Sequence, residues 1–189
     1  MNSAQYKKEL LDKLYKPYKS CNGCHFNMPP ATQVVMGEGN PNAAVLFIGE
    51  APGRDEDLQG RPFVGRSGKL LDKVIQIAGN NRMDVYITNV VKIRPPNNRK
   101  PLPQEIAIGK PLLLKQIKII RPRVICTLGS SALEGLLGEP VKMTLMRGKV
   151  ITWNGISLIP TYHPAYILRN PKELSAFVDD ISEAFRLSA

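Results

Sequence analysis

The feature that most constrains the fold is the alternation of short apolar runs with helical patterns along the chain. Runs of strand length, each followed by a loop rich in polar residues, glycine or proline, occur at residues 43–48, 85–91 and 124–128. Apolar residues also recur every three or four positions within residues 70–78, 104–120 and 129–137. Buried strands that alternate with helices form a parallel sheet with helices on both faces. We therefore predict an α/β fold: a three-layer α/β/α sandwich around a central, mostly parallel, four-stranded sheet.

The remaining segments fit this pattern. Residues 149–153 and 156–160 flank Asn154-Gly155, a strong sequence signal for a β-hairpin. Helical periodicity predicts a helix at each end of the chain, over residues 4–17 and 174–185.

Two further expectations concern the middle of the chain and its domain count. Gly109 and Pro111 are expected to disturb the helix over 104–120, and residues 50–65 are expected to form a long loop. The 189 residues are enough to bury a substantial core, so we predict one domain over 1–189.

The charge balance favours an anionic partner. The chain has 26 Lys+Arg against 16 Asp+Glu, a net charge of +10, and nucleic acid is the commonest partner for such a surplus. A merely basic surface is the alternative. No apolar stretch approaches the roughly 18 residues of a membrane span, and the N-terminus has no apolar signal segment. Three cysteines cannot close a disulfide framework, which favours a reducing, cytoplasmic location without a membrane partner.

Two short motifs resemble known sites but lack their context. Residues 60–67 approach a phosphate-binding Walker loop, but Arg66 stands where lysine is required and no strand directly precedes the segment. Cys21-Asn-Gly-Cys24-His25 matches the spacing of covalent haem attachment, a chemistry that requires export. Neither nucleotide hydrolysis nor haem binding is therefore expected.

Chemically informative residues follow the predicted strands. In open α/β sheets, ligands bind beyond the carboxyl ends of the strands, which selects the loops that begin at Gly49, Asn89, Thr127 and Thr161. Each polar residue there also has a structural interpretation. The acidic run after Gly49 is consistent with a solvated face, Phe63 with a core anchor, and Asn89 with a turn or cap. His163 is one of only two histidines in the chain.

Several segments together resemble the family 4 uracil-DNA glycosylases in order and spacing. They cover most of the chain between Cys21 and Pro171 and comprise Gly49-Glu-Ala-Pro-Gly53, Gly60-Arg-Pro-Phe-Val-Gly65, Tyr86-Ile-Thr-Asn-Val-Val-Lys92, Arg94-Pro-Pro96, Asn98-Arg-Lys-Pro101, Thr127-Leu-Gly129 and His163-Pro-Ala165. The resemblance implies a DNA-repair enzyme that flips uracil out of DNA and hydrolyses its N-glycosidic bond, leaving an abasic site.

The resemblance also implies roles for single residues. Phe63 would stack on the flipped base, and Asn89 would read its pyrimidine edge. His163 would donate a hydrogen bond to uracil O2 as negative charge develops there. Glu50 and the backbone of Ala51 would lie beside the sugar and the attacking water, Glu50 either as a base or as a group that positions the water.

Specificity and DNA contacts extend these assignments. Glu56 is expected to crowd the C5 edge of the base and disfavour the thymine methyl group. Phosphate contacts are expected from two helix starts and the basic loop over 92–100, and in particular from Ser67, Gly129, Ser130, Ser131, Arg94, Arg99 and Lys100. Ile167, Leu168 and Arg169 occupy the place of a wedge that enters the vacated base stack, although apolar residues there are equally consistent with packing.

The chain departs from the family at its metal site. The resemblance implies a [4Fe–4S] cluster held by four cysteines, and Cys21 and Cys24 match the first two. Ile93 and Gly109 stand at the other two positions, and Cys126 falls inside a predicted strand, where we expect a buried thiol. We therefore expect no cluster and no other cofactor. Two plain thiols, or a zinc ion shared between molecules, are the alternatives for Cys21 and Cys24.

The sequence thus predicts a monomeric uracil-DNA glycosylase that acts on single- or double-stranded DNA. Two alternatives remain open: a paralogue that binds uracil-bearing or damaged DNA without turnover, and a glycosylase with broadened specificity for deaminated bases. The presence together of Glu50, Phe63, Asn89 and His163 favours the enzyme, because a pure binder has less need of His163.

Overall fold

A mixed sheet of six strands forms the centre of the molecule, in the order β1-β3-β2-β4-β6-β5. The computed structural model describes residues 3–19 and 33–189. The inner strands run parallel: β3 (Tyr86–Asn89), β2 (Val45–Gly49), β4 (Val124–Leu128) and β6 (Ile156–Thr161). Two antiparallel edge strands flank them: β1 (Glu38–Gly39) and β5 (Ile151–Trp153). The predicted parallel sheet is confirmed, but the count of four strands is wrong. The edge strand β1 is only two residues long and carries no apolar run, so no sequence pattern marked it.

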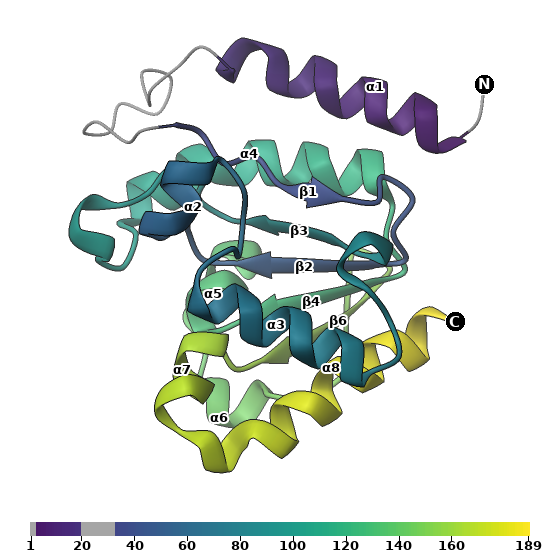
Figure 1. Ribbon diagram of the computed structural model, residues 1–189, viewed down its shortest axis with the longest axis vertical. Helices are drawn as coiled ribbons and strands as arrows, with labels where there is room; N and C mark the ends of the chain where they lie inside the picture. Colours follow the sequence, from purple (N-terminus) through teal and green to yellow (C-terminus); the bar gives the residue numbers. More distant parts are fainter. Residues whose placement is uncertain (1–2, 20–32) are drawn as a thin grey trace.

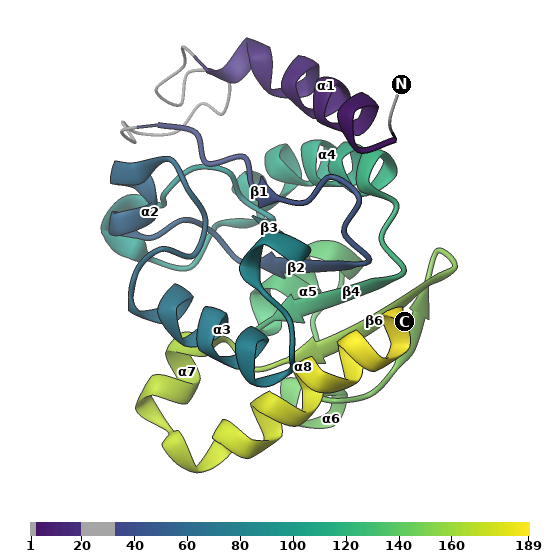
Figure 2. The ribbon, with the colours of Figure 1, turned by 45° about the vertical axis from the view of Figure 1, so that its right-hand side comes forward.

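Helices cover both faces of this sheet, as the alternation predicted (Figures 1 and 2). On one face lie α1 (Ser3–Tyr15), α4 (Pro103–Ile120) and α5 (Ser130–Leu137), and on the other α3 (Arg66–Ile77) and α8 (Leu174–Ser188). Side chains of a strand alternate between the two cores. Leu46 and Ile48 of β2 pack toward the first group of helices, whereas Val45 and Phe47 pack toward the second. The three-layer α/β/α sandwich is therefore confirmed.

The structure differs from the expected elements in two places. Helix α4 runs unbroken through Gly109 and Pro111, and Pro111 lies on the exposed side of the helix. The expected loop over 50–65 contains a short helix, α2 (Arg54–Gln59), whose N-cap residue Gly53 donates its N–H to the carboxylate of Glu56. The remaining short elements are α6 (Met143–Met146), α7 (Pro164–Arg169), η1 (Lys16–Tyr18), η3 (Arg82–Asp84), η4 (Pro96–Asn98) and η5 (Pro171–Glu173).

The segments that leave β2 and β3 stay paired beyond the strands. The Val90 N–H donates to Gly49 O at 2.9 Å, and the Val91 N–H donates to Glu50 O at 3.0 Å. These bonds fix the two loops side by side at the carboxyl edge of the sheet, where ligands of such folds bind.

Of the three cysteines, only Cys126 lies within the described residues. Cys126 on β4 is fully buried, as expected, and burial raises the pKa of its thiol. Cys21 and Cys24 lie outside the described residues, so their predicted state stays a prediction. Among the helices of the described residues, none has both the length and the apolar character needed to cross a membrane.

Candidate active site

A cavity of about 680 Å³ opens at the carboxyl edge of the sheet, where the loops after β2, β3 and β6 meet. This is the edge that the strand order predicted. The cavity brings together residues that are up to 119 positions apart in the sequence, and half of its lining consists of predicted site residues: Glu50, Ala51, Glu56, Phe63, Ser67, Asn89, Arg99, His163 and Arg169.

Asn89 presents an unused amide to this cavity. It is the last residue of β3 and is only 1% exposed. Neither its Oδ1 nor its Nδ2 has a hydrogen-bond partner within the described residues. A buried amide without partners costs free energy, so a ligand that offers one donor and one acceptor side by side would relieve that cost. The interpretation of Asn89 as a simple turn or cap residue does not account for this arrangement.

Phe63 and His163 lie near each other in the lining of the same cavity. Their ring centroids are 5.8 Å apart and the rings are tilted by 34°. Gly49 makes room for the ring of Phe63 and the amide of Asn89, since a Cβ at Gly49 would lie 2.5 Å from Phe63 Cζ and 2.4 Å from Asn89 Oδ1. The flat face of Phe63 and the amide of Asn89 thus lie close together beside Gly49. A planar heterocycle in the cavity could stack on the ring and form hydrogen bonds with the amide through its edge.

The protonation state of His163 follows from its surroundings. Its Nδ1 accepts a hydrogen bond from the Ala165 N–H at 3.1 Å, so the proton of the neutral ring is on Nε2. Burial of the ring, with a smaller contribution from the positive charge of Arg169, lowers its pKa to about 4, although Glu56 opposes the shift. At neutral pH His163 is therefore an uncharged hydrogen-bond donor rather than an imidazolium.

This depressed pKa predicts a pH-dependent stability. The unfolded chain binds the histidine proton below a pKa near 6.5, whereas the folded chain binds it only below about 4. The unfolded state therefore holds more protons in this window, and the free energy of unfolding falls as pH falls through it. His163→Gln removes the titrating ring. We expect the wild type to lose about 2 kcal/mol more stability than this variant between about pH 7.5 and about pH 5, measured by urea unfolding. An identical pH dependence in the two proteins would contradict the assigned pKa.

Glu56 has a different role from the one expected. Its Oε1 accepts from the N–H groups of Val64 and Gly65, both at 2.9 Å, and its Oε2 accepts from the Gly53 N–H at 3.1 Å. Both carboxylate oxygens are thus committed to the backbone of the loops around the cavity. The geometry assigns Glu56 to holding the loop that carries Phe63, and it does not support the prediction of a contact with the C5 edge of a base.

Glu50, by contrast, is free to act on a ligand. It directly follows β2, lines the cavity and is partly exposed. Within the described residues, no hydrogen bond or ion pair engages its carboxylate. A carboxylate without a protein partner at the cavity wall is suited to bind water or a polar group of the ligand.

Lys92 is the first residue of the basic segment 92–100, from which we expected contacts to DNA phosphates, but the structure places it in the core. It is fully buried, and its Nζ donates to Asn89 O at 2.5 Å, Gln116 Oε1 at 2.6 Å and Thr88 Oγ1 at 2.7 Å. Burial lowers its pKa, and the three acceptors match the three N–H groups of an ammonium. Lys92 thereby anchors the main chain of Asn89 from below. The burial of this lysine could have been inferred from its position within an apolar run that continues to Ile93.

Basic residues surround the mouth of the cavity, and two of them were not predicted. Arg54 and Arg66 are exposed and line the cavity together with Arg169. They are the first residues of α2 and α3, each directly after a family motif that ends at Gly53 or Gly65. Exposed arginines around a cavity favour an anionic ligand such as a phosphate backbone.

The predicted DNA-contacting residues divide into two groups. Ser67 on the first turn of α3 and Arg99 line the cavity, although Arg99 also pairs with Glu105 at 2.6 Å. The other group lies outside the cavity lining: Arg94, Lys100, Gly129, Ser130 and Ser131. The Gly129 N–H donates to Thr161 O at 2.9 Å and Ser131 is 6% exposed, so the geometry does not support a phosphate contact from either.

Part of the predicted wedge is also excluded by burial. Ile167 is 2% exposed and packs in the core beside Phe177, so it is unable to enter DNA. Leu168 is 39% exposed, and Arg169 lines the cavity. A wedge at this position is therefore restricted to Leu168 and Arg169.

The two positions that lack cysteine do not fit an iron–sulfur cluster. Ile93 is fully buried and packs in the apolar core. At Gly109, even a Cβ would lie 2.4 Å from the Val90 carbonyl oxygen, so a longer side chain would have to displace the segment after β3. Apolar packing at Ile93 and the close contact between α4 and the segment after β3 at Gly109 fill these two positions. Neither residue offers a metal ligand.

Comparison with known proteins agrees with this geometry. A family model described as the uracil DNA glycosylase superfamily matches residues 36–186. The chain belongs to the uracil-DNA glycosylase superfamily. It is 47% identical over 184 residues to a type-4 uracil-DNA glycosylase of Thermotoga maritima, with 94% of each chain covered. It is also 46% identical to the type-4 enzyme of Saccharolobus solfataricus, over 85% of this chain and 78% of that protein.

A type-5 uracil-DNA glycosylase of Pyrobaculum aerophilum is more distant, at 28% identity over 80% of this chain and 73% of the relative.

The matches to the type-4 enzymes confirm the resemblance to the family 4 enzymes. With it, the prediction of a DNA-repair enzyme of the uracil-DNA glycosylase class is confirmed as well.

Proposed function

We propose that this chain excises uracil from DNA through the cavity at the carboxyl edge of its sheet. The observation that carries the proposal is the buried, unpartnered amide of Asn89. Uracil presents N3–H and O4 on one edge, and an asparagine amide complements both with its oxygen and its nitrogen. Cytosine presents the opposite pattern and would leave both buried groups unsatisfied. Phe63 covers the face of the base once it has been flipped into the cavity.

His163 stabilises the departing base. Cleavage of the bond between the base and the sugar leaves negative charge on uracil, in part on O2. The neutral ring has its proton on Nε2, so it donates a hydrogen bond to O2 as the charge grows, without transferring a proton. A ring already charged in the ground state would require a counter-ion or solvent, and the buried site disfavours both.

Glu50 and the backbone of Ala51 hold the water that attacks the sugar. The C1′ carbon becomes electron-deficient as the base departs, and the carboxylate of Glu50 has no other partner among the described residues. The water oxygen bonds to C1′ as the bond from C1′ to uracil N1 breaks. The attacking water loses one proton and the uracil anion takes one up, so that the products are free uracil and an abasic site. Arginines around the cavity mouth, Arg54, Arg66 and Arg169, would bind phosphates on either side of the flipped nucleotide.

A monomer is sufficient for this activity, because the cavity and all of the proposed residues come from a single chain. Cys126 is a buried thiol, and unpaired thiols are typical of proteins in reducing compartments. This supports the proposed cytoplasmic location.

Release of free base separates an enzyme from a binding protein. We expect the purified chain to release uracil from many equivalents of uracil-containing DNA and to leave sites that alkali cleaves. His163→Ala should bind the same DNA but release base far more slowly. Tight binding of uracil-containing DNA by the wild type with no released base would support the non-catalytic alternative instead.

We also propose that the chain works without an iron–sulfur cluster. Four thiolates are the usual ligand set, and burial at Ile93 and the close approach at Gly109 support their replacement by packing. Protein purified without oxygen should contain almost no iron or acid-labile sulfide per chain, and should keep its activity after treatment with a chelator. Stoichiometric iron and sulfide, or loss of activity on chelation, would contradict this proposal.

A further inference from the structure

The backbone of Phe63 is unusual for an aromatic residue. Its φ angle is +50°, in the left-handed region that bulky side chains rarely adopt. Such a conformation persists only where surrounding contacts impose it, and these positions cluster at functional sites. Helix α3 packs directly against it, because a Cβ at Gly68 would lie 1.8 Å from the Phe63 carbonyl oxygen.

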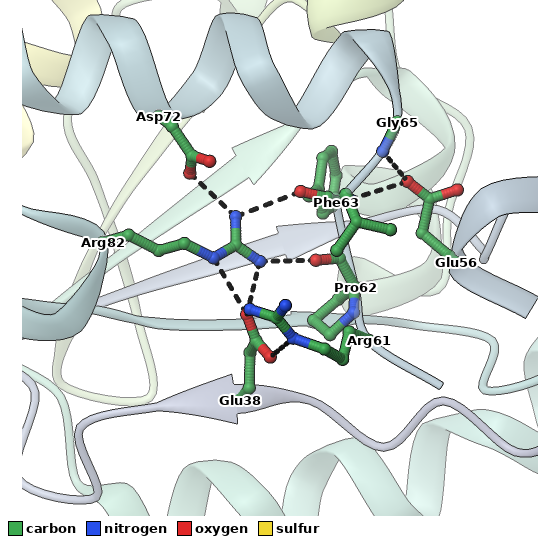
Figure 3. A network of polar contacts seen from close by, with 9 residues as sticks. Glu38, Glu56, Arg61, Pro62, Phe63, Gly65, Asp72 and Arg82 are labelled. Carbon is green, nitrogen blue, oxygen red and sulfur yellow. Dashed lines mark hydrogen bonds and ion pairs between the residues drawn. The ribbon is translucent and has the colours of Figure 1, made fainter. Parts of the chain in front are cut away.

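The guanidinium of Arg82, which does not line the cavity, holds this conformation (Figure 3). Its Nη2 donates to Pro62 O at 2.5 Å, and its Nη1 donates to Phe63 O at 3.1 Å. Two consecutive carbonyl groups are thus fixed by one rigid, planar group. Arg82 itself lies on η3, which directly precedes β3 in the chain.

Two carboxylates hold the guanidinium in place. Glu38 Oε1 accepts from Arg82 Nε at 2.9 Å and from Nη2 at 2.7 Å, and Asp72 Oδ1 accepts from Nη1 at 2.8 Å. All five N–H donors of the arginine therefore have acceptors. Its side chain is 17% exposed, so these charge-assisted bonds are partly shielded from water.

The same loop is held from its other side by Glu56. Figure 3 shows Arg82 bonded to the carbonyl groups of Pro62 and Phe63, and Glu56 bonded to the N–H groups that follow. The aromatic ring projects from a segment whose donors and acceptors are both fixed by charged side chains. A base that stacks on this ring would meet a surface that needs no rearrangement.

We propose that Arg82, oriented by Glu38 and Asp72, is a positioning residue that fixes the Phe63 ring for stacking on the flipped base. Arg82 does not line the cavity, and it acts only through Phe63. The inference rests on the proposed function for its catalytic consequence, but the clamp itself is a property of the free protein.

The catalytic consequence is measured by a double-mutant cycle on single-turnover cleavage at saturating enzyme. We expect Arg82→Met to slow cleavage by about tenfold to a hundredfold, as misplacement of a positioning group does, with affinity for uracil-free DNA unchanged. Arg82→Lys, which restores a charge but not the planar fork, should recover part of the rate. In a Phe63→Ala background, Arg82→Met should cost less than about threefold, because the ring it positions is gone.

The matched control is Arg61→Met. Arg61 also pairs with Glu38, at 2.7 Å, but it makes no bond to the carbonyl groups of Pro62 or Phe63. This variant should cleave at close to the wild-type rate. The same loss from Arg82→Met with and without the Phe63 ring would overturn the proposal, since a merely structural arginine would act independently of that ring.

A second measurement does not depend on activity. Hydrogen exchange of the free protein should show faster exchange across residues 62–68 in Arg82→Met and unchanged exchange there in Arg61→Met. Unchanged exchange in Arg82→Met would overturn the clamp even if the chain is an active glycosylase. Faster exchange in Arg82→Met, together with a wild type that releases no uracil, would retain the clamp and refute the proposed function.

Discussion

His163→Ala should slow the single-turnover cleavage of uracil-containing DNA by about a hundredfold to a thousandfold, the usual cost of removing one preorganised donor to a developing anion. The reason is specific to the state of this ring. Its Nδ1 is occupied by the Ala165 N–H and its pKa is lowered to about 4, so Nε2 offers one neutral, fixed N–H to the departing base.

The loss should appear in the rate and not in binding. Fluorescence anisotropy with uracil-containing DNA should give a Kd within about threefold of the wild type, because phosphate contacts dominate affinity for DNA. The wild-type rate should also stay level from about pH 8 to about pH 6, since a group with a pKa of about 4 does not titrate there. An undiminished rate in His163→Ala would exclude this residue as the donor to O2.

Asn89→Asp should reduce uracil cleavage by about tenfold to a hundredfold and narrow the preference for uracil over cytosine. A carboxylate keeps the acceptor for N3–H but loses the N–H that donates to O4, and an unmade hydrogen bond in a buried site costs about 1–3 kcal/mol. Because Asn89 is 1% exposed, water cannot replace the lost donor.

The control applies the same chemical change elsewhere. Asn42→Asp alters an exposed asparagine before β2, remote from the cavity lining, and should leave both rates unchanged. Cleavage rates for oligonucleotides with a single uracil or a single cytosine, measured in parallel, give the selectivity. An unchanged uracil-to-cytosine ratio in Asn89→Asp would remove Asn89 from base recognition.

The sequence predicted the framework of the site because that framework depends on local patterns. The apolar runs that form β2, β3 and β4 are continuous, so their carboxyl ends, and with them Glu50 and Asn89, could be placed at one edge. Family motifs then brought Phe63 and His163 to the same edge. The structure joins all four around one cavity.

What the sequence could not supply depends on contacts between distant segments. The bonds of Arg82 to the loop at Phe63 cross 19 and 20 positions, and its bond to Glu38 crosses 44. No periodicity encodes such pairs. Glu56 was expected to contact the C5 edge of the base, whereas its oxygens accept from three backbone N–H groups, two of them eight and nine positions further along the chain. The burial of Ile167 likewise depends on α3 packing against α7, a contact that short-range patterns do not specify.

The most direct test of the central claim is single-turnover cleavage of two oligonucleotides that differ only in one base, uracil or cytosine. We predict rapid cleavage at uracil by chelator-treated protein and cleavage at cytosine that is slower by about a hundredfold or more, because cytosine leaves the amide of Asn89 unsatisfied. Cleavage at cytosine as fast as at uracil, or no cleavage at uracil by folded protein that binds the DNA, would contradict the account of a cavity that reads uracil through Asn89.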